Sequence, residues 1–172
     1  VMFSARSYVE VDSIQGRLKM MLLDMGFPYD VVDAVLAEKA CDPYAALLGV
    51  KALSAWVARK DWRDILPAFS RCVRIIRDLE QTFNVNQDRF ESDYEVMLFK
   101  AITQAEVEIG QADTVDAFLE ALLPLVPVIN RFFDEVLVMA EDESTRQNRL
   151  ALIQRIAALA HGVADLSFLE GF

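Results

Sequence analysis

Apolar residues recur at every third or fourth position along most of this chain, which is the spacing of amphipathic helices. The first clear stripe predicts a helix over residues 13–25, closed by Gly26. Its members are Ile14, Leu18, Met21, Leu22 and Met25. No segment is convincing as a strand, and only 6 glycines and 5 prolines interrupt the pattern. The sequence therefore predicts an all-α fold.

Seven or eight helices are expected, packed as an antiparallel bundle. After the first, they are expected over residues 29–39, 43–59, 62–79, 92–109, from 114 to the prolines at 124 and 127, 130–139 and 144–165. An interior proline lacks the backbone N–H and clashes with the preceding turn, so the helix should kink or break at 124. We expect residues 1–12 to form a poorly ordered N-terminal extension, and 13–172 one domain with closely packed halves at about 13–80 and 81–172.

Several helix starts carry cap residues. Asp42 precedes Pro43, and Asp61 precedes the next helix, in positions where a side-chain oxygen can accept a bond from a free backbone N–H. Residues 92–95 and 144–147 have the Ser-x-x-Glu/Gln form of a capping box. We therefore expect Ser92 and Ser144 to cap their helices.

Charge is distributed unevenly along the chain. The net charge is −10, but residues 1–80 hold 11 Lys and Arg against 11 Asp and Glu, whereas residues 81–172 hold 6 against 16. A polyanion should therefore meet the first half. The acidic second half is either a solvated surface or a surface for a basic partner.

The helix expected at 62–79 carries the densest group of basic residues. At 100° per residue, its four arginines fall within an arc of about 120°, opposite the apolar stripe. They are Arg63, Arg71, Arg74 and Arg77, with Arg59 and Lys60 just before them. Arginine can bind phosphate and stack on an exposed base, so this stripe is a candidate RNA-binding surface. On the pattern alone, a solvated helix face, partly neutralised by Asp64 and Asp78, is favoured over RNA binding.

The last expected helix carries a second polar group, Arg146, Asn148 and Arg149, of which Asn148 and Arg149 lie at the edges of the apolar side. A charged side chain there must be paired or reach the rim. An ion pair of Arg149 with Asp134, Asp142 or another carboxylate, locking the last two helices together, is favoured over direct RNA contact.

Signals for catalysis or metal binding are weak. The chain has one histidine, His161, expected to be exposed, and two cysteines, Cys41 and Cys72, which are too few for a Cys/His zinc site. The glycines occur singly, so no glycine-rich phosphate loop is present. Asp30 with Asp33, or residues 141–143, could be pictured as metal ligands, but helix capping explains them better. We predict no catalytic residue and no metal site in this chain.

Residues 26–37, 68–76 and 132–153 form three segments that resemble the C-terminal anticodon-binding region of the bacterial glycyl-tRNA synthetase β subunit. Residues 26–37 are similar to its Gly-x-x-Tyr-Asp-Val-Ile-Asp-Ala-Val-Leu segment, and residues 68–76 to its Phe-Lys-Arg-Val-x-Asn-Ile segment, with Arg74 where asparagine is common. Residues 132–153 are similar to its Phe-Phe-Asp-x-Val-x-Val-Met…Asn-Arg-Leu signature. Residues 1–12 match nothing in that pattern, and the tail at residues 168–172 is atypical of it.

The resemblance implies an all-helical domain related to the anticodon-binding domain of arginyl-tRNA synthetase. It implies a fragment of a longer glycine-tRNA ligase that binds tRNA-Gly and is not itself catalytic, with ATP and Mg at the α subunit. The implied partners are tRNA-Gly, the α subunit and the remainder of β, in the bacterial cytoplasm and without a membrane. The alternative is a helical protein–protein scaffold that docks the α subunit or the rest of β through its acidic half.

Overall fold

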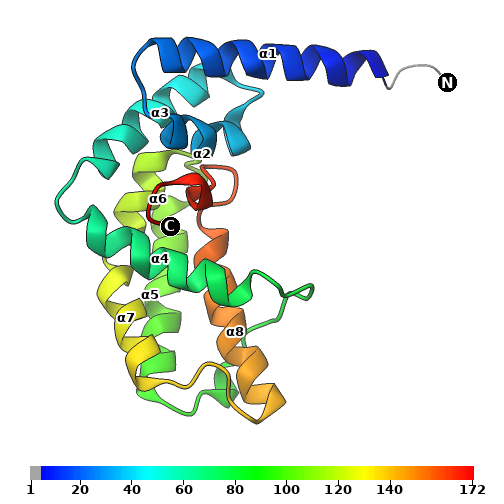
Figure 1. Cartoon of the computed structure of the whole chain (residues 1–172). Coiled ribbons are helices and arrows are strands. Elements are labelled where there is room, and N and C mark those ends of the chain that lie inside the picture. The colour runs from blue at the N-terminus through cyan, green and yellow to red at the C-terminus, as the bar shows by residue number, and fades with distance from the viewer. Residues whose placement is uncertain (1–4) are drawn as a thin grey trace.

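The computed structural model describes the backbone of residues 5–172 and the side chains of residues 15–172. Within that part of the chain, eight α-helices and two short 3-10 helices, η1 and η2, form the fold (Figure 1). They are α1 (Ala5–Asp24), α2 (Tyr29–Lys39), α3 (Pro43–Val57), α4 (Trp62–Ile76), η1 (Gln87–Arg89), α5 (Asp93–Ile109), α6 (Val115–Leu122), α7 (Leu125–Glu135), α8 (Glu143–Ala158) and η2 (Leu166–Phe168). The all-α prediction is confirmed.

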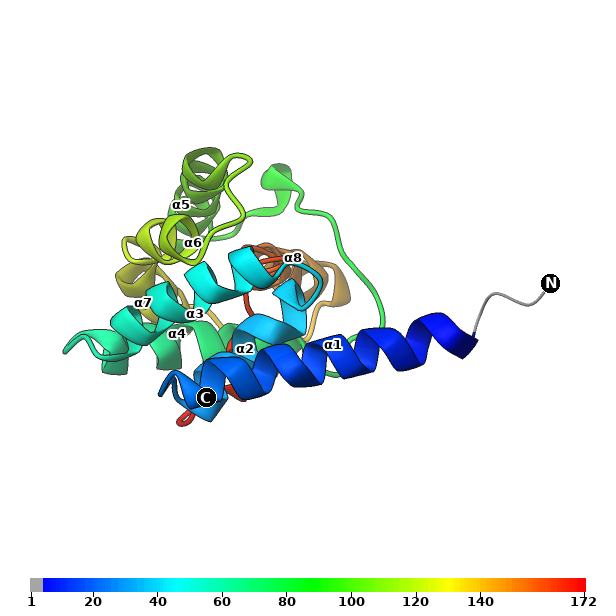
Figure 2. The ribbon, with the colours of Figure 1, turned by 90° about the horizontal axis from the view of Figure 1, so that it is seen from above.

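The first helix is longer than its apolar stripe indicated. α1 begins at Ala5 rather than residue 13, so most of the expected N-terminal extension is helical and residues 1–4 lie outside the described part. Leu18 and Leu22 of α1 are buried where this helix packs on α2. Its N-terminal end extends past the other helices in both ribbon views (Figures 1 and 2).

The helices are arranged in two groups. α5, α7 and α8 run lengthwise beside one another, with α6 leading into α7, and α4 crosses in front of them and packs on α7 and α8 (Figure 1). α1, α2 and α3 lie at one end, where α3 contacts α6 and α2 contacts η2. α4, expected in the first half, thus packs against helices of the second, and the division at residue 80 stays a prediction.

Two helix starts follow the cap chemistry expected from the sequence. Asp42 Oδ1 accepts hydrogen bonds from the backbone of Tyr44 and Ala45 at the start of α3. Ser92 and Glu95 form the capping box of α5. The helix that begins after Thr114 is also interrupted before Pro124, between α6 and α7, as expected for an interior proline.

Two other caps differ from expectation. Ser144 does not cap α8; Asp142 does, because its carboxylate accepts a 2.7 Å bond from the Thr145 amide and the helix starts at Glu143. Asp61 stands at the N-cap of α4 but makes no side-chain cap bond there. The helices expected to end at 59, 79, 139 and 165 end earlier, at Val57, Ile76, Glu135 and Ala158.

The core continues from α4 into α5–α8. Ile65, Phe69 and Cys72 on one face of α4 are buried, and the Phe69 ring meets that of Phe118 of α6 edge-on, with centroids 5.6 Å apart. Because this face is occupied by core contacts, the opposite face of α4 must be the exposed one. In the described part of the chain, no helix is long and apolar enough to cross a membrane.

Candidate nucleic-acid interface

The exposed face of α4 carries the four arginines that the sequence pattern predicted, Arg63, Arg71, Arg74 and Arg77, and we call it the arginine face. All four side chains are exposed, and Arg59 and Lys60 before them are exposed as well. Arg77 is the C-cap residue of the helix. The helical wheel therefore placed the basic side chains correctly.

Proline divides this face. Pro67 lies inside α4, about one turn after Arg63, and its ring nitrogen cannot donate to the Arg63 carbonyl. Ser70 donates its hydroxyl to the Pro67 carbonyl at 3.1 Å. Arg63 therefore lies before this missing backbone hydrogen bond, and the three later arginines follow it.

Arg71 is held by two residues of α7. Its guanidinium carbon lies 4.3 Å from the centroid of the Phe133 ring, and Nη1 is 4.0 Å from Asp134 Oδ1. Arg74 has a looser aromatic neighbour, since its guanidinium carbon is 5.8 Å from the Phe172 centroid. Both arginines therefore extend from α4 toward aromatic rings of other segments.

Arg59 is neutralised locally. Its Nε and Nη2 donate to the two carboxylate oxygens of Asp61 at 2.9 and 2.7 Å, and its guanidinium stacks 4.2 Å from the Trp56 ring. The bidentate hydrogen bond lowers the pKa of Asp61 and raises that of Arg59. Arg59 is thus the least available of the candidate cations.

The remaining candidates are less engaged. Within residues 15–172, Lys60, Arg63 and Arg77 form no ion pair, and neither Asp64 nor Asp78 pairs with an arginine of α4. The neutralisation expected from Asp64 and Asp78 is therefore not seen as direct pairing. The carboxylates that approach the basic residues are instead Asp61 and Asp134.

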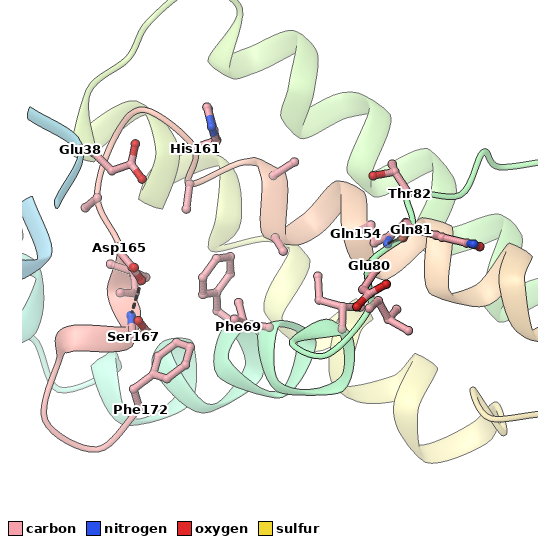
Figure 3. Close-up of a pocket in the computed structure, with 18 residues that line it drawn as sticks. Glu38, Phe69, Glu80, Gln81, Thr82, Gln154, His161, Asp165, Ser167 and Phe172 are labelled. Atoms are coloured by element: carbon pink, nitrogen blue, oxygen red, sulfur yellow. Dashed lines mark hydrogen bonds between the residues drawn. The ribbon is translucent and has the colours of Figure 1, made fainter. Parts of the chain in front are cut away.

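Two hollows border α4, one on the arginine face and one on the opposite side. A shallow one of about 470 Å³ is lined by Pro67, Ser70, Arg71, Arg74, Ile75 and Gly171. A second cavity, of about 440 Å³, lies between α4, α8 and the C-terminal segment, with Phe69 and Phe172 among its apolar walls (Figure 3). Carboxylates occur along the second cavity, those of Glu38, Glu80 and Asp165. The first hollow, between two guanidinium groups, is therefore better suited to an anion or a nucleotide.

Arg149 of α8 lies in a buried ion-pair network. It is 8% exposed, and its guanidinium donates to Glu95 at 3.0 Å, to Glu91 at 2.8 Å and to the Leu137 carbonyl at 3.0 Å. The expected ion pair exists, but its partners are the carboxylates of Glu91 and Glu95 at the start of α5. Asp134 and Asp142 are not its partners, so the pair joins α8 to α5 rather than to α7.

Two residues near Arg149 in the sequence, Asn148 and Arg146, form hydrogen bonds to the backbone of other segments. Asn148 is buried and exchanges two hydrogen bonds with the backbone of Asn86, at 2.7 and 3.0 Å. Arg146 donates to the carbonyls of Ala140 and Glu141 at 2.9 and 3.5 Å. These contacts fix the segments before η1 and before α8, and they favour the structural interpretation of all three residues.

Four carboxylates of the acidic half, which was considered above as a surface for a partner, bond within the chain. Glu106 pairs with Arg155, Asp113 with Lys39, Asp116 accepts from Trp56, and Glu108 accepts from Gln104. The Lys39 hydrogen bond lowers the pKa of Asp113.

His161 is exposed, as expected. Among the side chains described, no group of three or more His, Cys, Asp or Glu residues could hold a metal ion.

Residues 65–166 match the family model of the DALR anticodon binding domain, which covers more than half of the chain. The chain belongs to the DALR anticodon binding domain family. The DALR match begins on α4 and runs through α5, α6, α7 and α8 to η2, so it includes Arg71, Arg74 and Arg77. α1, α2 and α3, together with Arg59, Lys60 and Arg63, precede it.

The relatives cover more of the chain than the DALR match does. The chain is 34% identical to the glycine–tRNA ligase beta subunit of Shouchella clausii over 87% of its length, and 36% identical to glycine–tRNA ligase, chloroplastic/mitochondrial 2, of Arabidopsis thaliana over 92%. It is 34% identical to the beta subunit of Geotalea uraniireducens over 91%. The chain spans only 22%, 15% and 23% of these three relatives, respectively. The resemblance seen in the sequence is confirmed.

The aromatic neighbours of Arg71 and Arg74 were not predicted from the sequence. The sequence pattern pointed to neither Phe133 nor Phe172, and it offered Asp134 only as a partner of Arg149. The contacts join residues 62 positions apart for Arg71 and Phe133 and 98 apart for Arg74 and Phe172. No periodicity within one helix could indicate them.

Proposed function

We propose that this chain binds glycine tRNA through the arginine face of α4, as the anticodon-binding region of a glycyl-tRNA synthetase β subunit. The single observation that supports this most strongly is the exposed row of arginines on the helix at which the family match begins. The names of the relatives indicate which tRNA is meant, the one specific for glycine.

The mechanism is electrostatic anchoring followed by reading of the loop bases. Arg63, Arg74 and Arg77 bind phosphates of the anticodon arm, with Lys60 extending the path and Arg59 contributing less because of Asp61. Unstacked bases of the loop then lie against the surface beside α4. The net charge of −10 makes a concentrated basic surface necessary, because the rest of the chain repels RNA.

In this proposal the chain supplies recognition and another part of the enzyme supplies the chemistry. The α subunit holds ATP and Mg and forms the glycyl adenylate, while this region and the remainder of β hold the tRNA. The assembled enzyme works in the cytoplasm. A scaffold role through the acidic half is less favoured, since Glu106, Glu108, Asp113 and Asp116 already bond within the chain.

Charge reversal tests the surface. The variant with both Arg71→Glu and Arg74→Glu should bind glycine tRNA at least about tenfold more weakly, by fluorescence anisotropy at fixed salt, because two cations of the proposed RNA-binding surface become anions. The matched control is Lys100→Glu, an exposed cation on α5 that changes net charge by half as much. The same three proteins should be compared in the assembled synthetase. Unchanged affinity of the double variant in both settings would exclude this surface.

A further inference from the structure

Arg71 differs from the other arginines of the face in how it is held. Its guanidinium lies over the Phe133 ring at 4.3 Å, whereas Arg63 and Arg77 have no such ring among the described side chains and Arg74 is 5.8 Å from one. A guanidinium is planar and stacks on aromatic faces. Arg71 is therefore fixed as a flat group rather than left as a mobile cation.

The ring beneath Arg71 is itself fixed. Phe133 packs against the core and meets the Phe132 ring edge-on, with centroids 5.7 Å apart, and Phe132 is almost completely buried. The stack of Phe132, Phe133 and Arg71 thus extends from the core of α7 to the surface of α4. A platform built in this way loses little conformational entropy when a ligand covers it.

The outer side of Arg71 is open. Its side chain is 51% exposed, and it borders the shallow hollow that it shares with Arg74, Ser70 and Ile75. Asp134, 4.0 Å away, offsets part of the charge of Arg71. A partly neutralised guanidinium is a poorer phosphate anchor than its neighbours, but its planar face is unchanged.

We propose that Arg71 is a stacking platform for one unstacked base of the bound tRNA, and that the base enters the hollow between Arg71 and Arg74. This assignment rests on the proposed RNA function and makes Phe133 a positioning residue for Arg71. Bases in single-stranded loops stack on arginine planes and aromatic rings, so the ligand class is a nucleobase from the anticodon loop. Arg63, Arg74 and Arg77 remain the phosphate anchors.

The test separates charge from planarity. Arg71→Lys keeps the charge and removes the plane, so its affinity for glycine tRNA should fall about 5-fold to 150-fold, the range for loss of one base stack. The salt dependence of binding should not change, because the number of cations is the same. Arg131→Lys is the matched control, since Arg131 is exposed on α7 and its guanidinium lies 5.9 Å from the Tyr94 ring of α5. It should bind as the unaltered chain does.

A spectroscopic measurement reports the stack directly. Glycine tRNA transcripts with 2-aminopurine at single positions of the anticodon loop should show one position whose fluorescence changes on binding, and Arg71→Lys should abolish that change. Phe133→Leu should abolish it too, with unchanged salt dependence, provided that thermal unfolding shows the variant folded. Arg71→Lys, a surface change, decides the question if Phe133→Leu does not fold.

The outcomes are distinct. If Arg71→Lys binds normally and Arg71→Glu binds weakly, Arg71 is a phosphate contact and the platform is wrong while the RNA surface stands. If the double charge reversal at Arg71 and Arg74 has no effect, the proposed function fails along with the platform.

Discussion

Arg149 and Glu95 form a buried ion pair that joins α8 to the start of α5. The guanidinium Nε donates to Glu95 Oε1 at 3.0 Å, and the carboxylate is fully buried. Glu95 Oε2 accepts from the backbone amides of Glu91 and Ser92, each at 2.9 Å, which completes the capping box of α5. One carboxylate therefore caps a helix and anchors a cation from another helix.

Replacing Arg149 should cost much more stability than replacing an exposed arginine. Arg149→Met leaves the Glu95 charge buried without its cation, and it should lower the free energy of unfolding by about 3–5 kcal/mol. Arg155→Met is the matched control, because Arg155 pairs with Glu106 on the exposed surface and should cost about 1 kcal/mol or less. Urea titration followed by circular dichroism measures both. Equal losses would show that the burial of Glu95 has no special role.

Close packing of α2 on α3 should make Gly49 sensitive to a single methyl group. A Cβ at Gly49 would lie 2.9 Å from Val35 Cγ1, and overpacking of this kind costs about 1–3 kcal/mol, against the roughly 1 kcal/mol that alanine adds to a helix. Gly49→Ala should therefore lower the melting temperature. At Gly16 in α1 the same Cβ would meet nothing within 4 Å, so Gly16→Ala should raise or maintain it. Adding Val35→Ala to Gly49→Ala tests the cause, and a purely additive double variant would contradict it.

The two cysteines should differ in reactivity. Burial raises the pKa of the Cys72 thiol to about 12, whereas Cys41 is exposed. Since the thiolate is the reactive form, a thiol-specific reagent at pH 8 should modify one cysteine rapidly in the folded chain and two in urea. Cys41→Ser should abolish the rapid phase. Rapid labelling of Cys72 in the folded Cys41→Ser variant would show that α4 opens readily.

Asp142 should contribute a pH-dependent part of the stability. Hydrogen bonding from the Thr145 backbone lowers the pKa of Asp142 below its ordinary value of 3.8. The contribution is therefore fully present above pH 3.8 and is lost as the pH falls through the lowered pKa. Asparagine also caps helices but does not titrate, so the stability of the natural chain relative to Asp142→Asn should decline between pH 5 and pH 2. Comparing urea midpoints of the two proteins cancels the other carboxylates. A difference that is constant with pH would contradict the assignment.

Salt should weaken RNA binding in proportion to the number of phosphates neutralised. Three to four arginine contacts to a single-stranded loop predict a slope of log affinity against log salt of roughly −2 to −3. Arg77→Gln should reduce the magnitude of this slope by about 0.7 if it removes one phosphate contact. Binding assays from 50 to 200 mM KCl measure the slope, and an unchanged slope in Arg77→Gln would remove that residue from the set of phosphate contacts.

The sequence predicted the helices and the exposure of the arginines because both follow from the period of one helix. Ile65, Phe69 and Cys72 define the buried face of α4, and the opposite arc could be assigned by geometry alone. Local chemistry also predicted the Asp42 cap and the Ser92–Glu95 capping box. The Ser144 cap was wrong because Asp142, two positions earlier, is an equally good acceptor, and only the path of the chain decides between them.

Contacts between distant segments could not be predicted in the same way. Arg149 was expected to need a carboxylate, but 27 acidic residues were available, and the choice of Glu91 and Glu95 depends on how α8 lies against α5. The contact between the Phe133 ring and Arg71 likewise depends on how α7 lies against α4. The sequence indicates which groups need partners, and the tertiary packing decides which partners they obtain.

The adjacent rings of Phe132 and Phe133 connect the packing of the core with the surface proposed to contact RNA. Phe132 fills the core, and Phe133, in contact with it, supports Arg71 at the surface. A substitution that repacks the interior of α7 would therefore also tilt a group proposed to touch RNA. In this domain, selection for thermal tolerance and selection for tRNA discrimination should act on the same dipeptide, so neither could change freely without affecting the other.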